Sequence, residues 1–281
     1  MNDETKTIAL VGPGVMAEAI IGGLLRQGIT TPNRILISGP RPERIDELEQ
    51  RYGVSGFSDN REAARRADVV ILSIKPQRLS KVLFNLSGNI PAHALVLSII
   101  AGASLQTISE GLKHAAVVRS MPNTPAQIGE GITVWTASPA VLENHLEQAR
   151  QILSALGTEV FVEEEYYLDM ATALSGTGPA YVFLFMEALI DAGVHMGFPR
   201  RIAEQLVTQT IQGSVSYYQK HKDHPAQLRN QVTSPGGTTA QALYYLEKAG
   251  FRTAISRAIW AAYERSQELG KGLNSQPPSA E

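Results

Sequence analysis

The chain is 281 residues long, 43% hydrophobic and 19% charged, which is the composition of a soluble globular protein with one large or two smaller domains. Its formal charge of -2 provides no positive excess to neutralise phosphates, which argues against a nucleic-acid-binding protein. Cysteine is absent, so disulfides, thiolate nucleophiles and cysteine metal sites are excluded.

The first residues of the chain, Met1 to Glu4, are acidic and lead within a few positions into an apolar strand pattern. We therefore expect no signal peptide. No uninterrupted apolar run reaches the roughly 18 residues that a membrane span requires, so no membrane partner is expected. Together with the lack of cysteine, these features predict a soluble, cytoplasmic protein.

A glycine-rich turn joins the first predicted strand, residues 8–11, to a helix that begins at Val15. The strand is a short apolar run, and the helix has apolar positions at three- and four-residue spacing. Gly12, Gly14 and Ala17 fill the pattern G-x-G-x-x-G/A, in which the first glycine permits the turn and the second lets a pyrophosphate approach the backbone. The pattern predicts dinucleotide binding at the start of the helix. The alternative is a plain strand-to-helix turn.

The residues at the end of the second predicted strand, residues 34–38, indicate whether NAD or NADP is preferred. NAD-specific enzymes usually place Asp or Glu about 20 residues past the glycine turn, and this chain has Ser38 and Gly39 there. Arg41 and Arg44 follow closely, and guanidinium groups accept the 2′-phosphate that a carboxylate repels. The sequence therefore favours NADP(H), with NAD(H) as a second cofactor. The alternative for both arginines is a solvated position on the next helix.

Strands and helices continue to alternate, which predicts a doubly wound parallel sheet. Further strands are expected at residues 54–57, 68–74, 94–100, 115–119, 131–136 and 159–162, with a helix over residues 140–156. Ligands of such sheets bind beyond the carboxyl ends of the strands. The segments 75–77, 101–104 and 120–125 follow three of these strands, so we expect them to border one crevice.

The pattern changes from strands to long apolar helices after the acidic triplet 163–165. The expected division is a nucleotide-binding domain at residues 1–163, a helical domain at residues 164–273 and a disordered tail at residues 274–281. Helices are expected over residues 168–174, 180–196 and 201–218, with a break at residues 175–179 and a loop at residues 219–224. No strand is expected after Val162.

A second polar loop precedes a helix in the second half of the chain. Residues 232–239, Val-Thr-Ser-Pro-Gly-Gly-Thr-Thr, contain two glycines and four hydroxyls. Backbone N–H groups and hydroxyls at a helix N-terminus can bind a carboxylate. The alternative is an ordinary helix cap without a ligand.

The sequence resembles pyrroline-5-carboxylate reductase over nearly its whole length. The matching runs are Gly-Pro-Gly-Val-Met-Ala at 12–17, Lys-Pro-Gln at 75–77, Met-Pro-Asn-Thr-Pro at 121–125, Ser-Gly-Thr-Gly-Pro-Ala at 175–180 and the polar loop at 232–239. The last run lies within the family's signature and is much more specific than the glycine turn. Thr177 stands where a serine is commoner, and the loop after Ser38 varies among members.

The resemblance implies an α/β Rossmann domain followed by an all-α dimerisation domain that intertwines with that of a second subunit. The active site of the family lies at the dimer interface. It also implies that the substrate carboxylate is bound by Ser234, Gly236, Gly237, Thr238 and Thr239, mainly through backbone N–H groups, with the Thr239 hydroxyl facing the ring nitrogen. The cofactor-binding residues expected from the pattern and the resemblance together are Val11, Gly12, Pro13, Gly14, Val15, Met16, Ser38, Arg41, Asn60, Ser73, Ile74, Lys75, Pro76, Met121 and Asn123.

The reaction implied by the resemblance is hydride transfer to the C=N carbon of 1-pyrroline-5-carboxylate, which gives L-proline in the last step of its biosynthesis. Because a protonated imine is already electrophilic, the protein mainly supplies orientation and a place for charge. Thr239 is therefore assigned as a hydrogen-bond partner of the nitrogen and not as an acid. A related cyclic imine is left open as the natural substrate.

Two rival functions are weighed against this one. A 3-hydroxyacid dehydrogenase of similar build needs a lysine early in its second domain, and no lysine occurs between Lys113 and Lys220. A non-catalytic NADP-binding regulatory protein has no need of the loop at 232–239.

No metal site is expected, because His221 and His224 lack carboxylate support. The apolar helices after Tyr166 predict self-association as a dimer or a larger oligomer.

Overall fold

The computed structural model describes residues 6–274. The chain divides into two compact units. Unit 1 extends to Thr177 and includes the end of the chain from Ala262, and unit 2 is Gly178–Ala261. The boundary expected after residue 163 and the disordered tail stay predictions, and all of the tail except Asn274 lies outside the described residues.

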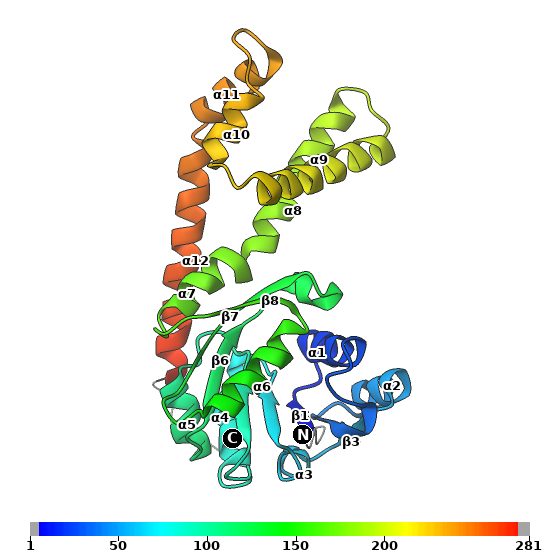
Figure 1. Cartoon of the computed structure of the whole chain (residues 1–281), viewed down its shortest axis with the longest axis vertical. Helices are drawn as coiled ribbons and strands as arrows, with labels where there is room; N and C mark the ends of the chain where they lie inside the picture. The colour runs from blue at the N-terminus through cyan, green and yellow to red at the C-terminus, as the bar shows by residue number, and fades with distance from the viewer. Residues whose placement is uncertain (1–5, 275–281) are drawn as a thin grey trace. The chain divides into compact units, whose positions relative to one another are not determined.

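Unit 1 is built on one eight-stranded sheet with the order β3-β2-β1-β4-β5-β6-β7-β8 (Figure 1). Its strands are β1 (Ile8–Val11), β2 (Ile35–Ser38), β3 (Ser55–Phe57), β4 (Val69–Leu72), β5 (Leu95–Ser98), β6 (Val117–Met121), β7 (Gly131–Ala137) and β8 (Gly157–Phe161). The first six strands are parallel, which confirms the doubly wound arrangement expected from the alternating pattern.

The last two strands run in the opposite direction. β7 pairs antiparallel with β6, and β8 pairs parallel with β7. The segment between β6 and β7 holds only the short 3-10 turn η3 (Thr124–Ile128), too short for a crossover helix, so the chain turns back beside β6. The carboxyl end of β7 therefore lies at the amino edge of the parallel strands.

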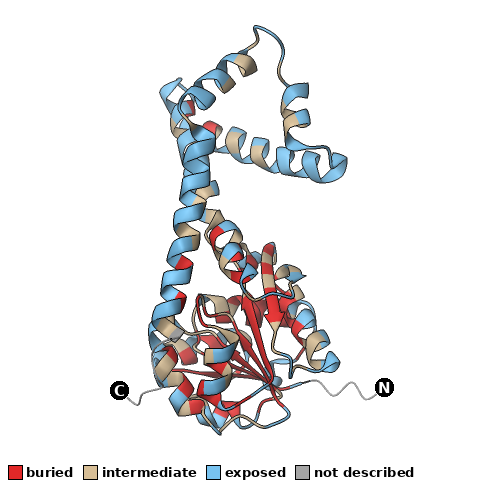
Figure 2. Cartoon of the chain, turned by 90° about the vertical axis from the view of Figure 1, so that its left-hand side faces the viewer, coloured by how far each residue is buried: buried red, intermediate tan, exposed pale blue. Residues whose placement is uncertain are grey.

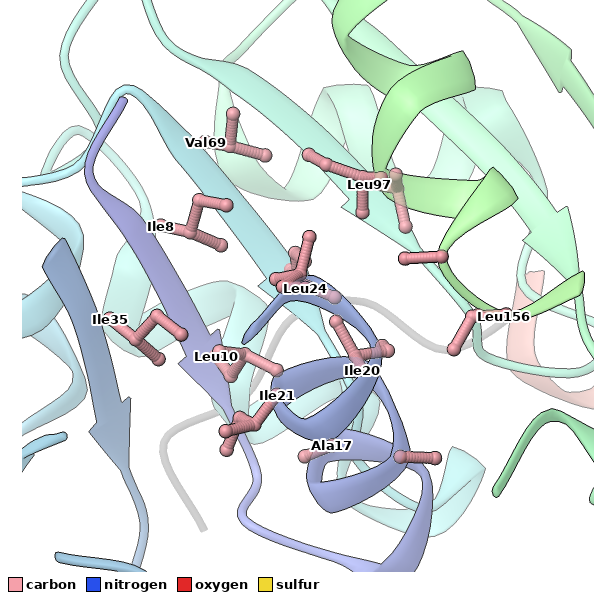
Figure 3. Packing of buried hydrophobic residues seen from close by; sticks show 14 of the residues in the cluster. Ile8, Leu10, Ala17, Ile20, Ile21, Leu24, Ile35, Val69, Leu97 and Leu156 are labelled. Carbon is pink, nitrogen blue, oxygen red and sulfur yellow. The ribbon is translucent and has the colours of Figure 1, made fainter. Parts of the chain in front are cut away.

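Successive residues of the parallel strands point to opposite faces, and each face is covered by its own helices. Ile8 and Leu10 of β1 pack against Ile20, Ile21 and Leu24 of the first helix (Figure 3). This face is covered by α1 (Val15–Arg26), α2 (Pro42–Tyr52) and α6 (Glu143–Ser154), and the other by α3 (Asn60–Ala64), α4 (Leu79–Leu86) and α5 (Leu105–Leu112). The full burial of β1, β2, β4 and β5 explains why these strands read as nearly continuous apolar runs.

Unit 1 ends in a helical stretch that differs from the sequence prediction. α7 (Tyr167–Ala171) passes into a π-helical segment, η4 (Thr172–Gly176), and the chain continues as α8 (Gly178–His195). The expected break at residues 175–179 is thus shorter than predicted and is confined to Thr177, a bend between η4 and α8. The hydroxyls of Thr172 and Ser175 donate to the carbonyls four residues earlier, and that of Thr177 to the carbonyl of Thr172. These bonds satisfy the polar groups of the wide turn inside the helix.

Unit 2 is entirely helical, as expected after Val162 for the residues that the structure describes. It consists of α8, α9 (Arg200–His221), α10 (Pro225–Gln231), α11 (Thr238–Lys248) and the first half of α12 (Phe251–Asn274). The expected loop at residues 219–224 begins later than predicted, since α9 continues to His221. Lys222 is the C-cap residue of α9, and its backbone is left-handed, with a φ of 58°.

Unit 2 has almost no core of its own (Figure 2). All its residues are described, and only Gly193 and Ala203 among them are buried. Large apolar side chains are exposed on its helices, among them Phe183, Leu184 and Tyr245. A helical unit with so little buried apolar surface lacks a driving force for folding alone, so its apolar faces need a partner.

The stretch Tyr167–His195 is long and apolar enough, by length and composition alone, to cross a membrane. An 18-residue window within it has a mean hydropathy of 1.4, and the expectation that this chain has no membrane partner stays a prediction. Glu187 and Asp191 interrupt its apolar sequence. A single helix of this kind is weak evidence for a membrane, because core helices of soluble proteins have the same composition.

The end of α12 packs tightly on the loop that follows β5. A Cβ atom on Gly102, whose φ is 77°, would lie 3.0 Å from the backbone nitrogen of Gly270. Both residues belong to unit 1. Two glycines thus allow the backbone of the last helix to contact a loop at the carboxyl edge of the sheet.

We expect Gly102→Ala to lower the free energy of unfolding by about 2 kcal/mol, through left-handed strain and displacement of α12. Gly28→Ala is the matched control, because Gly28 has a φ of 66° but no atom within 4 Å of the place where a Cβ would lie. The control should lose only about 1 kcal/mol. Thermal and urea unfolding of both variants measure the difference, and equal losses would show that the contact with Gly270 contributes nothing.

Candidate active site

The glycine turn after β1 is held by two neighbouring strands. The N–H of Gly12 donates to the carbonyl of Ser38, 2.9 Å away at the end of β2. The φ of Gly12 is 97°, and a Cβ there would lie 2.6 Å from the carbonyl oxygen of Ser73, which follows β4. Only glycine meets both conditions, so the turn fixes the chain where three parallel strands end.

The turn leads directly into the N-terminus of α1. Gly14 is the N-cap residue, with extended backbone and no atom within 4 Å of a Cβ position. No side chain caps the helix, and its first N–H groups, from Val15 to Ala17, have no intrahelical acceptor. Unpaired N–H groups beside open space at a helix N-terminus suit a diphosphate, so the turn fits the cofactor that its sequence pattern predicts.

Arg44 of α2 supports the turn from behind. Its Nε donates to the carbonyl of Pro13 at 3.1 Å, and its Nη2 pairs with Glu18 of α1. Arg51 and Tyr52 also donate to Glu18, at 2.6 and 3.0 Å. Burial alone raises the pKa of Glu18, but the hydrogen bonds from Arg44 and Tyr52 hold it below its ordinary value. Glu18 is therefore a charged anchor for these groups.

This network separates the two arginines that the sequence treats alike. Arg44 is occupied by Glu18, Pro13 and Glu47, and its side chain is mostly buried. Arg41 is the exposed N-cap residue of α2, and its side chain has no hydrogen bond or ion pair among the described residues. Its guanidinium is thus free, as the predicted contact with a 2′-phosphate requires.

A cavity of about 400 Å³ opens at the carboxyl ends of β1, β2 and β4. Val11, Gly12, Ile74 and Asn60 of the expected cofactor site line it. Arg61, Arg78 and Lys81 line it too, and the sequence analysis missed them. Arg78 and Lys81 closely follow the Lys-Pro-Gln run at residues 75–77, which was the available signal.

An acidic side chain in this cavity is neutralised locally. Asp59 caps α3 by accepting from the N–H of Arg61, and the Arg61 guanidinium donates to both of its carboxylate oxygens. The Arg61 side chain and backbone hydrogen bonds lower the pKa of Asp59. Because the carboxylate is paired, it does not repel an anion as strongly as a free one would.

The remaining expected cofactor residues differ in how far they are buried. Ser38 is fully buried, and its hydroxyl has no partner among the described residues, so its part in an adenosine site stays a prediction. Val15 and Lys75 are exposed at their turns. Pro13, Gly14, Met16, Ser73, Pro76, Met121 and Asn123 are buried or half-buried along the same carboxyl edge.

The end of β6 is tied to the π-helical segment. Asn123 donates from Nδ2 to the carbonyl of Ser175 at 3.2 Å and accepts the N–H of Ile132 at 3.0 Å. A Cβ on Gly176 would lie 2.7 Å from the methyl carbon of Met121. Two runs far apart in the sequence, 121–125 and 175–180, therefore meet within unit 1.

A buried arginine reinforces this junction, and the sequence analysis did not single it out. Arg119 of β6 is 5% exposed and pairs with Glu165 at 2.8 Å and Asp169 at 3.3 Å. Ser266 of α12 also donates to Asp169, at 2.8 Å. All four residues belong to unit 1, where one guanidinium connects β6 with α7 and, through Asp169, with the end of α12.

The polar loop lies in unit 2. Gly236 has a φ of 72°, and the N–H of Gly237 donates to the carbonyl of Ser234 at 3.1 Å, which closes a turn before α11. Gly237 is the N-cap residue, and no side chain caps the helix. Ser234, Gly236 and Thr238 are exposed. The ordinary side-chain cap considered as the alternative is therefore absent, and the first N–H groups of α11 are available to a ligand.

Comparison with known proteins decides the family. The model for pyrroline-5-carboxylate reductase dimerisation matches residues 165–269, and one for NADP oxidoreductase, coenzyme F420-dependent, matches residues 7–102. A pyrroline-5-carboxylate reductase of Synechocystis sp. is 46% identical over 264 residues, 94% of this chain and 98% of that protein. The chain belongs to the pyrroline-5-carboxylate reductase family.

Solved structures of the family agree with this assignment. The pyrroline carboxylate reductase of Plasmodium falciparum, with NADP bound, has a TM-score of 0.87 and 33% identity, covering 95% of this chain and 99% of that one. The enzyme of Coxiella burnetii has a TM-score of 0.85 and 36% identity, with the same coverage. The resemblance inferred from the sequence, the Rossmann domain and the helical dimerisation domain are confirmed.

Cofactor preference follows from the separate roles of the two arginines. We expect Arg41→Ala to reduce kcat/KM for NADPH about tenfold or more and to leave that for NADH nearly unchanged, because only NADPH carries the 2′-phosphate. Steady-state kinetics with both cofactors measure the ratio. Preference of the unaltered protein for NADH would contradict this interpretation of the loop.

Arg44→Ala provides the comparison. Its loss should impair both cofactors alike, because the glycine turn that binds the shared diphosphate loses its support at Pro13. Arg44→Lys keeps the positive charge but loses the guanidinium group that binds Pro13 and Glu18 together. It should therefore restore little of the activity lost in Arg44→Ala. If Arg44→Ala lowers kcat/KM for NADPH but not for NADH, Arg44 instead binds the 2′-phosphate.

Proposed function

We propose that this chain is a pyrroline-5-carboxylate reductase that reduces the C=N bond of 1-pyrroline-5-carboxylate to L-proline with NADPH. The observation that carries the proposal is the open N-terminus of α11, with its glycine turn and Thr239, in a chain of this family. A related cyclic imino acid is the alternative substrate. Assay of NADPH oxidation with a panel of cyclic imino acids tests the choice.

The cofactor would be held along the carboxyl edge of the sheet in unit 1. The N–H groups after Gly14 suit the diphosphate, Arg41 the 2′-phosphate, and Asn60 and Ile74 line the adenosine side. Lys75, Pro76, Met121 and Asn123 are the expected nicotinamide side. The bound dihydronicotinamide supplies hydride, and NADP(H) is preferred over NAD(H). Cofactor orientation would then depend on strand ends that are fixed by hydrogen bonds.

The substrate carboxylate would bind at the start of α11. Its two oxygens need donors, and the N–H groups of Thr238 and Thr239 follow the N-cap Gly237 with no acceptor in the helix. Thr239 is half-buried, which leaves its hydroxyl at a site partly shielded from water. We assign this hydroxyl to the ring nitrogen, where it orients the imine.

The protein would stabilise charge rather than deliver a strong acid. A protonated imine enters as a cation, and reduction converts it to a neutral amine that takes up a proton from solvent. In the cofactor cavity and behind the glycine turn, the shifted pKa values belong to Glu18, Tyr52, Asp59 and the arginines Arg44 and Arg61, which serve the fold and the cavity. Lys75 is exposed and would line the cofactor edge without acting as a base.

Thr239 can be tested against its neighbour. Thr239→Val removes one hydroxyl at nearly constant volume, and kcat should fall about ten- to a hundredfold if that bond strengthens as the imine is reduced. Thr238→Val is the matched control and should change kcat little, because Thr238 is expected to act through its backbone. Stopped-flow kinetics with both variants measure the reduction step. Equal kcat values for Thr239→Val and the unaltered protein would remove this role.

Gly237→Val tests the backbone cradle. A Cβ at Gly237 would lie 3.2 Å from the carbonyl of Ser234, so a branched side chain should deform the turn. KM for the imino acid should rise, while the Kd for NADPH, whose expected site is in unit 1, stays near its original value. Fluorescence titration and circular dichroism accompany the kinetics. A weaker Kd for NADPH with an unchanged KM would place the substrate elsewhere.

Self-association is expected from the exposed faces of unit 2. Phe183 is 60% exposed on α8 in a unit without its own core. Phe183→Glu should therefore weaken the oligomer and lower activity, whereas Phe84→Glu, at a 53% exposed site in unit 1, should leave the mass unchanged. Light scattering at micromolar concentration measures both. A stable, active monomer of the unaltered protein would contradict the expectation.

A further inference from the structure

The strand order of unit 1 places the end of β6 on a definite side of the glycine turn. In the order β2-β1-β4-β5-β6, the turn and α1 follow β1, and Arg41 follows β2. A dinucleotide with its diphosphate at α1 and its 2′-phosphate on the β2 side extends its other half toward the ends of β4, β5 and β6. The residues that follow β6 therefore lie on the nicotinamide side.

Asn123 follows β6 and is the N-cap residue of η3. Asparagine at an N-cap usually accepts a hydrogen bond from the turn that it begins, but the side chain of Asn123 makes no such bond. Its Oδ1 instead accepts the N–H of Ile132 at 3.0 Å. The pairing of β6 with β7 ends at Met121 and Val134, so this bond continues the contact between the two strands past their last pair.

The other end of the Asn123 amide binds the π-helical segment η4. Its Nδ2 donates to the carbonyl of Ser175 at 3.2 Å. In an α-helix that carbonyl would accept the N–H of residue 179, but residue 179 is a proline and has no N–H. Asn123 thus supplies a donor that the helix cannot. Since one partner is an N–H and the other a carbonyl, only this orientation of the amide satisfies both.

The same connection holds the wide turn of η4 beside Met121. The carbonyl of Thr172 accepts both the N–H and the hydroxyl of Thr177, at 2.8 and 2.9 Å, and this five-residue spacing defines the wide turn. The turn brings Gly176 so close to Met121 that a Cβ would lie 2.7 Å from the Met121 methyl carbon. Met121 is itself one of the residues expected on the nicotinamide side.

We propose that Asn123 is a positioning residue for the hydride transfer. Its amide is engaged with the protein and not with the cofactor, and it fixes Met121 and the wide turn of η4 against the end of β6, where they limit the positions open to the nicotinamide. This role rests on the proposed function, because hydride transfer is the step that it serves. The expected diphosphate and adenosine contacts lie at other strand ends and do not depend on this amide.

Asn123→Asp tests the role with almost no change in volume. The carboxylate keeps the acceptor for Ile132 but places a negative oxygen against the carbonyl of Ser175. In single-turnover stopped-flow experiments at neutral pH, hydride transfer should slow about ten- to a hundredfold, because a small misplacement of a reacting group has an effect of this size. The isotope effect on kcat with NADPH deuterated at C4 should rise, and the Kd for NADPH should stay the same.

The pH dependence of the same variant supplies a second measurement. As the pH falls, the introduced carboxyl takes up a proton and can then donate to the carbonyl of Ser175, as the amide does. The hydride-transfer rate of Asn123→Asp, divided by that of the unaltered protein, should therefore rise toward one at low pH. A ratio that does not change with pH would mean that the donor to Ser175 has no part in the reaction.

Two further variants complete the test. Asn89→Asp is the matched control, because Nδ2 of Asn89 also donates to backbone carbonyls, those of Asn85 and Ser87, but lies between α4 and β5 at the amino edge of the sheet. It should leave the hydride-transfer rate and the isotope effect unchanged. Gly176→Ala displaces the Met121 methyl, the end of a flexible side chain, so it should slow hydride transfer at little cost in stability.

The fluorescence lifetime of bound NADPH, measured without substrate, tests the role of Asn123 independently of the reaction. It should change in Asn123→Asp and Gly176→Ala and stay the same in Asn89→Asp. If the unaltered protein reduces no cyclic imino acid, the proposed function fails, and the lifetimes still decide the role of Asn123. An unchanged lifetime and hydride-transfer rate in Gly176→Ala or in folded Asn123→Asp, or an equal change in Asn89→Asp, would overturn the proposal.

Discussion

The close approach of backbone at Gly12 is the constraint on which unit 1 depends. The N–H of this residue is bound by β2, and its Cα faces the carbonyl at the end of β4 with no room for a side chain. Three parallel strands thus end in register at the point where α1 begins. Any cofactor at this edge meets N–H groups whose positions are fixed by the sheet itself, so little ordering remains to be done on binding.

Behind the turn, electrostatics decides which groups are free. Glu18 would be an obstacle to phosphate if it were unpaired, since its helix begins at the diphosphate position. Arg44, Arg51 and Tyr52 surround it, so its charge is used within the protein. The same logic applies at Asp59, which Arg61 neutralises. The carboxylates near the expected anion site are each paired, whereas the Arg41 side chain is exposed and unpaired among the described residues.

The parts of the fold that the sequence predicts are those set by local pattern. Branched apolar runs marked β1, β4 and β5 because both faces of these strands are buried, and the glycine turn and polar loop were visible from their residues. The direction of β7 could not be predicted, since it depends on the short connection between β6 and β7 and not on composition. The break at residues 175–179 was predicted too long because glycine and proline usually end a helix. Here the π-helical segment includes Gly176, and Pro179 lies in the first turn of α8, where proline is tolerated.

Side-chain partners far apart in the sequence were equally out of reach. The sequence alone does not distinguish Arg41 from Arg44. Arg44 pairs with Glu18 because α2 packs against α1. Arg119 lies within an apolar strand, where its acids are 46 and 50 residues away. Long-range pairs of this kind carry no periodicity, so a single sequence gives no signal for them.

Arg119 connects β6 with the two segments of unit 1 that flank unit 2 in the chain. The chain leaves unit 1 after Thr177, at the end of η4, and returns to it at Ala262 within α12. Asp169 lies on α7 before the first crossing, and Ser266 lies on α12 after the second. Arg119 holds both through Asp169, on the strand whose end carries Met121 and Asn123. A buried charge released from its partners is costly, so the two crossings and the strand end are stabilised together. Within unit 1, the two segments that flank the helical unit in the chain are thereby tied to the strand that is expected to face the nicotinamide.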